Sequence, residues 1–404
     1  MAAMALLALL GLVAGSAGAA AAKKQPNFVY VLCDDMNELL GDEAIVKQTR
    51  ALIADKGARA ANAFVSSPKC TPSRSAWLSG RYYHNLRPGQ SEGAQVSGKG
   101  LNTTHFFDHD AVFPQLHQHG YQTALFGKIH NDQAEWLCHP TNHTEPFTHI
   151  ETECSPCGNY FPNAFVVKKS ADALHTSMET LPSDPAKNAT NCSVPLKHCR
   201  GSTSFFCPTD KDPHQCSGQE SSHYSHAQYG NRSVAFIKQA AKTNKPFFVF
   251  VGTTGPHLPS SPAPWHQAIA DSMNISAPRS PNFNMLASDH FDLLATHPIL
   301  TPDLVGDIDS LMRQRWGTLL SIDDLVAGLH NAVDEAGLLD NTYFLYSSDH
   351  VRIPQYCNRA QHSAAQRSAA QRSAARRDEP RNRVCTYRSA AGLSLRLADG
   401  LTFS

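Results

Sequence analysis

The stretch NFVYVLCDD, Asn27 to Asp35, is the best indicator of the fold: a short apolar run that ends in two aspartates. Three further runs have the same composition, dense in β-branched and aromatic residues: YQTALFG (121–127), PFFVFVG (246–252) and TYFLYSS (342–348). Such runs are typical of buried strands in a parallel sheet. Stretches with helical periodicity lie between them, at 43–56 and 307–340. This alternation predicts an α/β fold, a doubly wound and mostly parallel sheet with helices on both faces.

Composition limits the class of protein. The chain has 404 residues, 41% of them hydrophobic, and a formal net charge of zero. This length can bury a substantial core, and the balanced charge argues against nucleic acid or an anionic membrane as a partner. Residues 1–22 combine a short apolar run with small residues, which is typical of a signal peptide. No run reaches the roughly 20 apolar residues of a membrane span, so we expect no transmembrane segment.

Cysteine usage fits export to an oxidising compartment. Many of the eleven cysteines crowd residues 138–216, which we interpret as a cysteine-rich insertion. The pair Cys154 and Cys157 also suits zinc, but no second pair at zinc spacing follows nearby, so disulfides are the preferred interpretation. Candidate N-glycosylation sites are the six Asn-x-Ser/Thr sequons at Asn102, Asn142, Asn188, Asn191, Asn231 and Asn274.

Each of the four predicted strands is followed by charged or imidazole side chains, which are, in chain order, Asp34 and Asp35, Lys128 and His130, His257, and Asp349 and His350. The carboxyl ends of strands in an open α/β sheet face the ligand crevice, so we expect these groups in one site. Taken singly, aspartates after a strand are often helix caps, and histidines are common on surfaces. Three carboxylates together, however, repel one another unless a cation lies between them. A hard ion such as Ca²⁺, which takes about 6 to 8 oxygens, fits that requirement.

The segment PKCTPSRSAWLSGR, Pro68 to Arg81, holds a further candidate. Pro72 fits the first turn of a helix, which places Cys70 at or just before a helix N-terminus. Free N–H groups and the helix dipole favour an anion there, so the position suits a nucleophile that attacks an anionic group. From the residues alone, Cys70 is either a reactive thiolate or half of a disulfide.

The stretch CTPSRSAWLSGR (70–81) resembles the C-x-P-S-R-x-x-x-L-x-G-R signature of the type I sulfatases, formylglycine-dependent members of the alkaline-phosphatase-like superfamily. The resemblance extends over about 26–350. Family blocks are matched in order by PNFVYVLCDDMNELLGD (26–42), GYQTALFGKIH (120–130), GPHLP (255–259) and YSSDH (346–350). The first block and the Cys70 segment look like the N-acetylglucosamine-6-sulfatases, whereas Lys128-x-His130 and YSSDH look more like arylsulfatases.

The resemblance implies that a formylglycine-generating enzyme of the endoplasmic reticulum oxidises Cys70 to formylglycine (3-oxoalanine), directed by Cys70, Pro72 and Arg74. One oxygen of the hydrated aldehyde would attack the sulfur of a sulfate ester, and the other would then expel sulfate. The implied ligands of Ca²⁺ are Asp34, Asp35, the modified Cys70, Asp349 and His350.

The resemblance also assigns catalytic roles. Arg74 and Lys128 would neutralise the diol oxygen and the sulfate. His130 would take the proton that collapses the intermediate, and His257 would bind the sulfate or protonate the leaving alcohol.

Two departures from the family pattern follow His350. Val351 stands where the family usually has glycine, and no lysine occurs in 351–404, where the family places one that helps to hold sulfate. Residues 351–404 contain a Ser-Ala-Ala repeat with arginine, a low-complexity composition typical of disorder. We interpret them as a disordered tail or an error in the gene model, in place of the C-terminal subdomain of the family.

The sequence therefore predicts a sulfuric ester hydrolase of the secretory pathway, secreted or lysosomal, with a sulfated carbohydrate or an aryl sulfate as substrate. Two other classes stay open. A metal-dependent phosphodiesterase would share the sheet and the aspartates, but would carry Thr or Ser where this chain has Cys70. An inactive sulfatase-like glycoprotein that binds glycans is favoured by the missing lysine.

Overall fold

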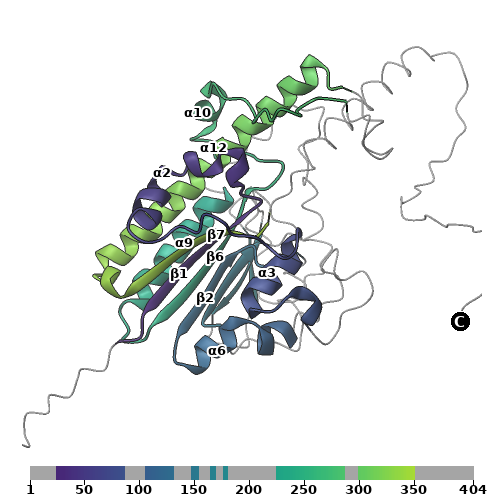
Figure 1. Cartoon of the computed structure of the whole chain (residues 1–404). Helices are drawn as coiled ribbons and strands as arrows, with labels where there is room; N and C mark the ends of the chain where they lie inside the picture. The colour runs from purple at the N-terminus through teal and green to yellow at the C-terminus, as the bar shows by residue number, and fades with distance from the viewer. Residues whose placement is uncertain are drawn as a thin grey trace, which may run out of the picture. The chain divides into compact units, whose positions relative to one another are not determined.

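The computed structural model contains a seven-stranded sheet with the order β5-β4-β3-β2-β6-β1-β7. Figure 1 labels β1, β2, β6 and β7 in this sheet. The structure describes residues 24–86, 105–131, 147–153, 164–169, 176–180, 224–286 and 299–350, all within one unit of the chain, Met1–Pro354. The strands are β1 (Asn27–Asp34), β2 (Gln122–Gly127), β3 (His149–Glu153), β4 (Ala164–Lys169), β5 (Thr176–Thr180), β6 (Phe247–Pro256) and β7 (Thr342–Ser348).

The four predicted strands are β1, β2, β6 and β7, and they are neighbours in the sheet. β6 pairs in parallel with β1 and β2, and β7 pairs in parallel with β1. This confirms the mostly parallel α/β fold. β3 continues the parallel part beside β2, whereas β4 and β5 form an antiparallel edge. These three strands lie in the predicted cysteine-rich insertion, where the runs are short and carry charged side chains.

Helices cover both faces of the sheet, with α3 (Cys70–Ser79) and α6 (Val112–Gln118) on one face and α9 (Ser225–Ala240) and α12 (Pro302–Glu335) on the other (Figure 1). Side chains of β1 alternate between the two cores, as strand geometry requires. Tyr30 and Leu32 pack in the α3/α6 core, whereas Val29 and Val31 pack in the α9/α12 core. The shorter helices are η1 (Glu38–Leu40), η2 (Asp42–Ala44), α2 (Lys47–Thr49), η3 (Arg50–Ala54), η4 (Tyr83–Asn85), η5 (Phe106–Asp110), α10 (Gln267–Ser272) and η10 (Leu339–Asn341).

The predicted helix at 43–56 is wrong as a single element. The structure divides it into a 3-10 turn, one α-helical turn and a π-helical turn, η2, α2 and η3. The cause is tertiary: the backbone N–H groups of Gln48 and Thr49 donate to the carboxylate of Asp323 on α12, at 3.0 and 2.7 Å. A distant side chain therefore caps α2 and fixes where it begins.

The predicted helix at 307–340 is α12, but with shifted bounds. It begins at Pro302 because Thr301 caps it, its hydroxyl accepting from the backbone N–H of Leu304 at 3.4 Å. Proline at the first helical position also favours this start. The helix ends at Glu335, shortly before Gly337 with a φ of +67°.

Two glycines, Gly127 and Gly252, let β2 and β6 approach each other closely where β2 ends. A Cβ on Gly252 would lie 1.7 Å from the carbonyl oxygen of Lys128, and Gly127 has a φ of +75°. The backbone N–H of Lys128 donates to the Gly252 carbonyl at 2.8 Å. Lys128 therefore leaves β2 held against β6, in the middle of the parallel strands.

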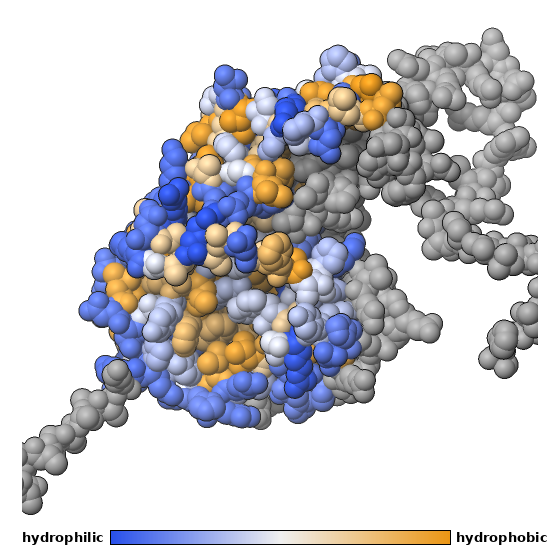
Figure 2. All heavy atoms as spheres, in the orientation of Figure 1, coloured by the Kyte–Doolittle hydropathy of each residue, from blue (hydrophilic) through white to orange (hydrophobic). Residues whose placement is uncertain are grey.

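Apolar side chains remain on the surface of β7, an outer strand among the described residues. Tyr343 and Leu345 are 62% and 41% exposed, and Trp77 of α3 is 40% exposed. Figure 2 shows apolar areas among hydrophilic ones on the face that it displays. In the described parts of the chain, no helix combines the length and apolar character needed to cross a bilayer.

Candidate active site

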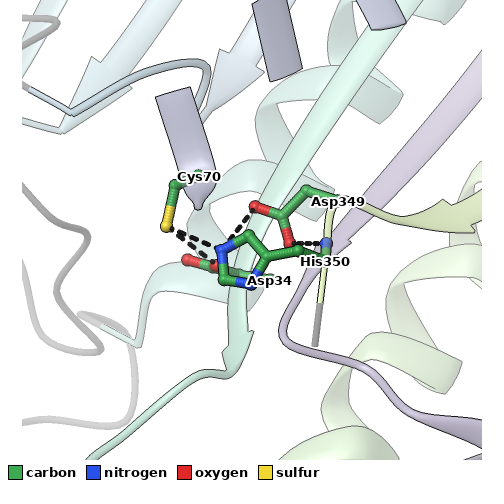
Figure 3. A group of neighbouring side chains, drawn as sticks. All are labelled: Asp34, Cys70, Asp349 and His350. Carbon is green, nitrogen blue, oxygen red and sulfur yellow. Dashed lines mark hydrogen bonds and ion pairs between the residues drawn. The ribbon is translucent and has the colours of Figure 1, made fainter. Parts of the chain in front are cut away.

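Side chains from separate elements converge at the carboxyl ends of the parallel strands (Figure 3). Asp34 ends β1, Cys70 begins α3, and Asp349 and His350 follow β7. Ligand atoms of these four residues all lie within 4.8 Å of one another, and those of Asp34, Asp35 and His257 satisfy the same limit. The polar clusters that follow β1, β6 and β7 thus lie close together.

Cys70 is the first residue of α3 and a free, buried thiol, so the disulfide alternative does not hold in the structure. Its Sγ lies 3.1 Å from Nε2 of His350, 3.5 Å from Nζ of Lys128 and 3.6 Å from Oδ1 of Asp34. A group at this position therefore faces a lysine, an imidazole and a carboxylate at once.

Arg74 lies one turn further along α3 and is fully buried. Its Nε donates to Oδ2 of Asp349 at 2.8 Å, and Nη1 donates to the backbone carbonyl of Lys128 at 2.6 Å. Nη2 lies 3.9 Å from Oδ1 of Asp34. Burial lowers the pKa of Arg74, but Asp349 and Asp34 outweigh it and hold the pKa above its usual value. Arg74 therefore joins three of the strand ends as a permanent cation.

Lys128 and Asp34 form a buried ion pair between the ends of β2 and β1. Burial raises the pKa of Asp34, but Lys128, His257 and Arg74 outweigh it and hold that pKa well below its usual range. Burial likewise lowers the pKa of Lys128, and Asp34 raises it above its usual value. Both groups are charged at neutral pH, so the sheet ends with a carboxylate and an ammonium group beside Cys70.

Asp349 organises the other side of the site. Its Oδ1 accepts from the backbone N–H groups of Asp35 at 3.2 Å and of His350 at 2.7 Å. Nδ1 of His350 lies 3.0 Å from Oδ1 of Asp35. Burial lowers the pKa of His350, but contacts with Asp35, Cys70 and Asp349 raise it to about 10. These acidic groups thus favour positive charge, here a protonated His350, which would have to lose its proton to bind a metal.

His130 lies in an aromatic pocket beside α3. Its Nε2 and the Ser75 hydroxyl are 2.9 Å apart, and its ring centroid lies 5.3 Å from that of Phe106 and 5.0 Å from that of Phe107. Burial, with a contribution from Arg74, lowers its pKa to about 3. His130 is therefore neutral at physiological pH, with a ring whose orientation is set by packing.

His257 lies on the open side of the site, with 18% of its side chain exposed. Its Nδ1 donates to the backbone carbonyl of Leu258 at 2.6 Å, which leaves Nε2 facing Oδ2 of Asp35 at 3.9 Å. Among the histidines predicted for the site, it is the one with the most access to a ligand that enters from solvent.

The residues present fit a hard divalent cation. Three carboxylates supply oxygen atoms, which Ca²⁺ prefers, and Oδ1 of Asp35 is buried without a hydrogen-bond partner although His350 lies beside it. A carboxylate oxygen without a hydrogen bond is costly to bury unless a cation compensates it, here a protonated His350 or a metal ion in its place. Imidazole is a softer ligand than calcium prefers, so His350 fits less well than the carboxylates.

Sequence reasoning assigned no role to three buried residues that support the site: Arg315, Asp42 and His226. Arg315 of α12 pairs with Asp42 and donates to the backbone carbonyl of Asp35. His226 of α9 accepts from the backbone N–H of Gly255 at 3.0 Å, and its Nδ1 lies 2.7 Å from the Ser321 hydroxyl. A charged residue on the apolar stripe of 307–340 is the signal that could have identified Arg315. His226 has no comparable signal in the sequence.

His226 gives a prediction about acid stability. Burial lowers its pKa to about 3, so the native protein leaves it neutral where an unfolded chain would protonate it below about pH 6.5. Stability present above pH 6.5 is therefore lost as the pH falls toward 3. Between pH 7 and 4.5 this linkage amounts to about 2 to 3 kcal/mol. Urea unfolding should show a pH dependence smaller by that amount in His226→Gln.

His119→Gln is the matched control, because His119 is an exposed histidine at the end of α6. Its substitution should leave the pH dependence of unfolding unchanged. Equal pH dependence in wild type and His226→Gln would mean that the native fold accepts the proton at His226.

Two of the six sequons lie in the described residues. Asn231 on α9 and Asn274 after α10 are both exposed, as candidate glycosylation sites should be. The predictions that fall outside the described residues are the signal peptide at 1–22, most of the insertion, the tail at 351–404, and the sequons Asn102, Asn142, Asn188 and Asn191.

Comparisons with known proteins identify the family of the chain. The sulfatase family profile matches residues 26–374. Human N-acetylglucosamine-6-sulfatase is 29% identical over 337 residues, which are 82% of this chain and 52% of that protein. An extracellular sulfatase SULF-1 homolog of Drosophila melanogaster is 25% identical over 335 residues, 82% of this chain and 25% of that protein. The chain spans about half the length of the N-acetylglucosamine-6-sulfatases that it matches.

Among solved structures, a protein in complex with its substrate D-glucosamine-2-N,6-O-disulfate has a TM-score of 0.52 and 18% identity, covering 81% of this chain and 65% of that chain. This likeness concerns the fold. Because the family profile covers most of the sequence, from the first strand past the last site residue, the chain belongs to the sulfatase family.

Proposed function

We propose that the chain is a sulfuric ester hydrolase that cleaves sulfate monoesters, with residues 26–350 as its catalytic domain. The observation that carries the proposal is the position of Cys70, at the start of α3 with its sulfur facing Lys128 and His350. A nucleophile at a helix N-terminus beside fixed cations suits an anionic substrate. The same segment has the C-x-P-S-R sequence of the family.

Oxidation of Cys70 to formylglycine, by a formylglycine-generating enzyme of the endoplasmic reticulum, is part of this proposal. When hydrated, the aldehyde supplies two hydroxyl groups, one that attacks sulfur and one that allows sulfate to leave. The surroundings of Cys70 support such a role, because it is only 8% exposed and competing reactions with solvent would be limited. Lys128 and Arg74 would hold the sulfate oxygens by charge.

Ca²⁺ is the cation that we propose for the acidic groups, held by Asp34, Asp35, Asp349 and His350 together with the modified side chain at Cys70. Bound there, it supplies positive charge that polarises the sulfate group. The support is that ligand atoms of Asp34 lie within 4.8 Å of those of Asp349 in one group and of Asp35 in another. Oδ1 of Asp35 is also buried, with the His350 ring 3.0 Å away.

The two remaining histidines would move protons. His257 is the most exposed of the site histidines, with Nε2 3.9 Å from Oδ2 of Asp35, so His257 suits protonation of the leaving alcohol. His130 is neutral because of its burial, and an anionic sulfate nearby would raise its affinity for a proton. His130 would then accept the proton whose loss expels sulfate.

Sulfated glycans of the glycosaminoglycan type, such as those with N-acetylglucosamine-6-sulfate, are the proposed substrates, with aryl sulfates as the second possibility. The proteins named N-acetylglucosamine-6-sulfatase among the relatives support the first class. The secretory pathway is the proposed location, secreted or lysosomal. Relatives named as extracellular sulfatases and the exposed sequons at Asn231 and Asn274 support it.

One experiment tests the proposal. The chain is purified from a eukaryotic secretory host, the Cys70 peptide is examined for an aldehyde by mass spectrometry, and aryl sulfate and aryl phosphate are assayed with calcium and with a chelator. We expect an aldehyde at Cys70 and calcium-dependent hydrolysis of the sulfate, with N-acetylglucosamine-6-sulfate as the test of substrate class. Phosphate turnover with an unmodified thiol would instead identify a phosphodiesterase.

A second candidate function has its own support. No lysine occurs in 351–404 and Val351 replaces the usual glycine, so an inactive sulfatase-like protein that binds glycans is the alternative. An aldehyde at Cys70 without turnover of any sulfate ester would favour this alternative.

A further inference from the structure

Arg315 lies in the middle of α12 and reaches the loop that follows β1. Its Nε lies 3.0 Å from each carboxylate oxygen of Asp42, and its Nη2 donates to Oδ2 of the same group. Nη2 also donates to the backbone carbonyl oxygen of Asp35. The side chains of Arg315 and Asp42 are 6% and 0% exposed. One buried guanidinium thus joins a carboxylate to the main chain of Asp35.

Asp35 has a backbone conformation that needs support. Its φ is +71°, in the left-handed region that residues with a Cβ rarely adopt. The N–H of Asp35 donates to Oδ1 of Asp349 at 3.2 Å, and its carbonyl accepts from Arg315. Both peptide groups of Asp35 are thereby held, which fixes the direction of its Cα–Cβ bond, from which the carboxylate extends.

The carboxylate of Asp35 extends toward the site. Oδ1 of Asp35 lies 3.0 Å from Nδ1 of His350 without a hydrogen bond, and Oδ2 lies 3.9 Å from Nε2 of His257. Asp42 also holds the main chain just after Asp35, because its Oδ2 accepts from the backbone N–H of Asn37 at 2.7 Å. Asp42 also balances the charge of Arg315, so the guanidinium adds little repulsion toward a cation beside Asp35.

We propose that Arg315 and Asp42 are positioning residues for the metal site: they hold the main chain of Asp35 so that its carboxylate binds the cation, and thereby set the affinity for Ca²⁺. The inference rests on the proposed function, because it takes Asp35 as a calcium ligand. A buried ion pair with a structural role alone would stabilise the fold without changing metal affinity. The bond from Arg315 to the Asp35 carbonyl is what links the pair to the ligand.

The test is Arg315→Lys in the full chain, with Ca²⁺ binding measured by isothermal titration calorimetry. Lysine keeps the charge but cannot bond a carboxylate and a carbonyl in the same fork geometry. Substitution of a group that orients a metal ligand typically weakens binding by about 10- to 100-fold, and we expect that range. Arg279→Lys is the matched control, because Arg279 forms a more exposed pair with Asp309 of α12 at 2.6 Å, and its affinity for Ca²⁺ should equal that of wild type.

Two further variants separate positioning from folding. Asp42→Asn retains an acceptor for the N–H of Asn37 and should also weaken Ca²⁺ binding. It replaces Arg315→Lys as the test variant if Arg315→Lys does not fold. In the Asp35→Asn background, Arg315→Lys should weaken binding by less than about twofold, because the ligand that it positions is already impaired. Thermal unfolding with a chelator reports the structural contribution, and unfolding with excess Ca²⁺ reports the stabilisation by bound metal.

Wild-type affinity in a folded Arg315→Lys or Asp42→Asn variant would overturn the positioning role, as would full additivity with Asp35→Asn. A wild-type chain that neither binds Ca²⁺ nor hydrolyses sulfate esters would overturn the proposed function, and the positioning role with it. The two failures are therefore distinguished by the wild-type titration.

Discussion

Cys70→Ser is expected to lower the turnover of a sulfate ester by at least about 1,000-fold, the scale of loss when a nucleophile is removed. Serine has one hydroxyl group, so it can attack sulfur once but has no second oxygen from which sulfate can be expelled. The sulfated serine would then be held beside Lys128 and Arg74, whose charges favour the bound sulfate. Steady-state assays of an aryl sulfate, with mass spectrometry of the Cys70 peptide, measure both the loss and the trapped product.

Cys33→Ser is the matched control. Cys33 is the other free cysteine among the described residues, buried at the end of β1 with its Sγ 3.2 Å from the Tyr346 hydroxyl. Burial raises the pKa of Cys33 to about 12, so it is a neutral thiol without a place in the proposed chemistry. We expect its variant to keep at least half of the wild-type turnover. Sustained multiple turnover by Cys70→Ser would contradict release of sulfate by elimination.

The central strands were predictable because burial on both faces leaves a continuous apolar run. β3 lacks such a run and was missed. Its Glu151 is only 5% exposed, although a glutamate in a short run is normally expected on the surface. The structure compensates this charge with Arg232 of α9 and His149. The partner on α9 is distant in sequence, so only the folded chain shows why a glutamate can lie inside the sheet.

The candidate site was predictable to the extent that its residues follow strands or begin a helix. Topology alone brings Asp34, Lys128 and Asp349 together, because β2, β6, β1 and β7 are consecutive in the sheet with their carboxyl ends at one edge. Supporting residues follow no such rule. Arg315 lies on the apolar stripe of α12, and its partner Asp42 begins the short 3-10 helix η2, which no periodicity predicts. Their association depends on how α12 crosses the sheet, which the sequence does not specify.

Asp349→Ala is expected to weaken Ca²⁺ binding by at least about 100-fold, because loss of a ligand should exceed the 10- to 100-fold cost of losing a residue that only orients one. The carboxylate is fully buried and does three things at once. It offers charge to the cation, accepts from the backbone of Asp35 and His350, and pairs with Arg74. Calorimetric titration with Ca²⁺ and the calcium dependence of turnover measure the effect.

Alanine also leaves the guanidinium of Arg74 without its nearest carboxylate, and breaking a buried pair costs about 3 to 5 kcal/mol. Asp349→Asn separates that cost from loss of the ligand charge, because its amide oxygen can still accept from the N–H groups of Asp35 and His350. Asp303→Asn, on the exposed first turn of α12, is the control and should bind Ca²⁺ as wild type does. An unchanged calcium titration in a folded Asp349→Asn variant would remove Asp349 from the metal shell. The cation would then have to be bound by Asp34 and Asp35, whose ligand atoms lie within 4.8 Å of each other and of His257.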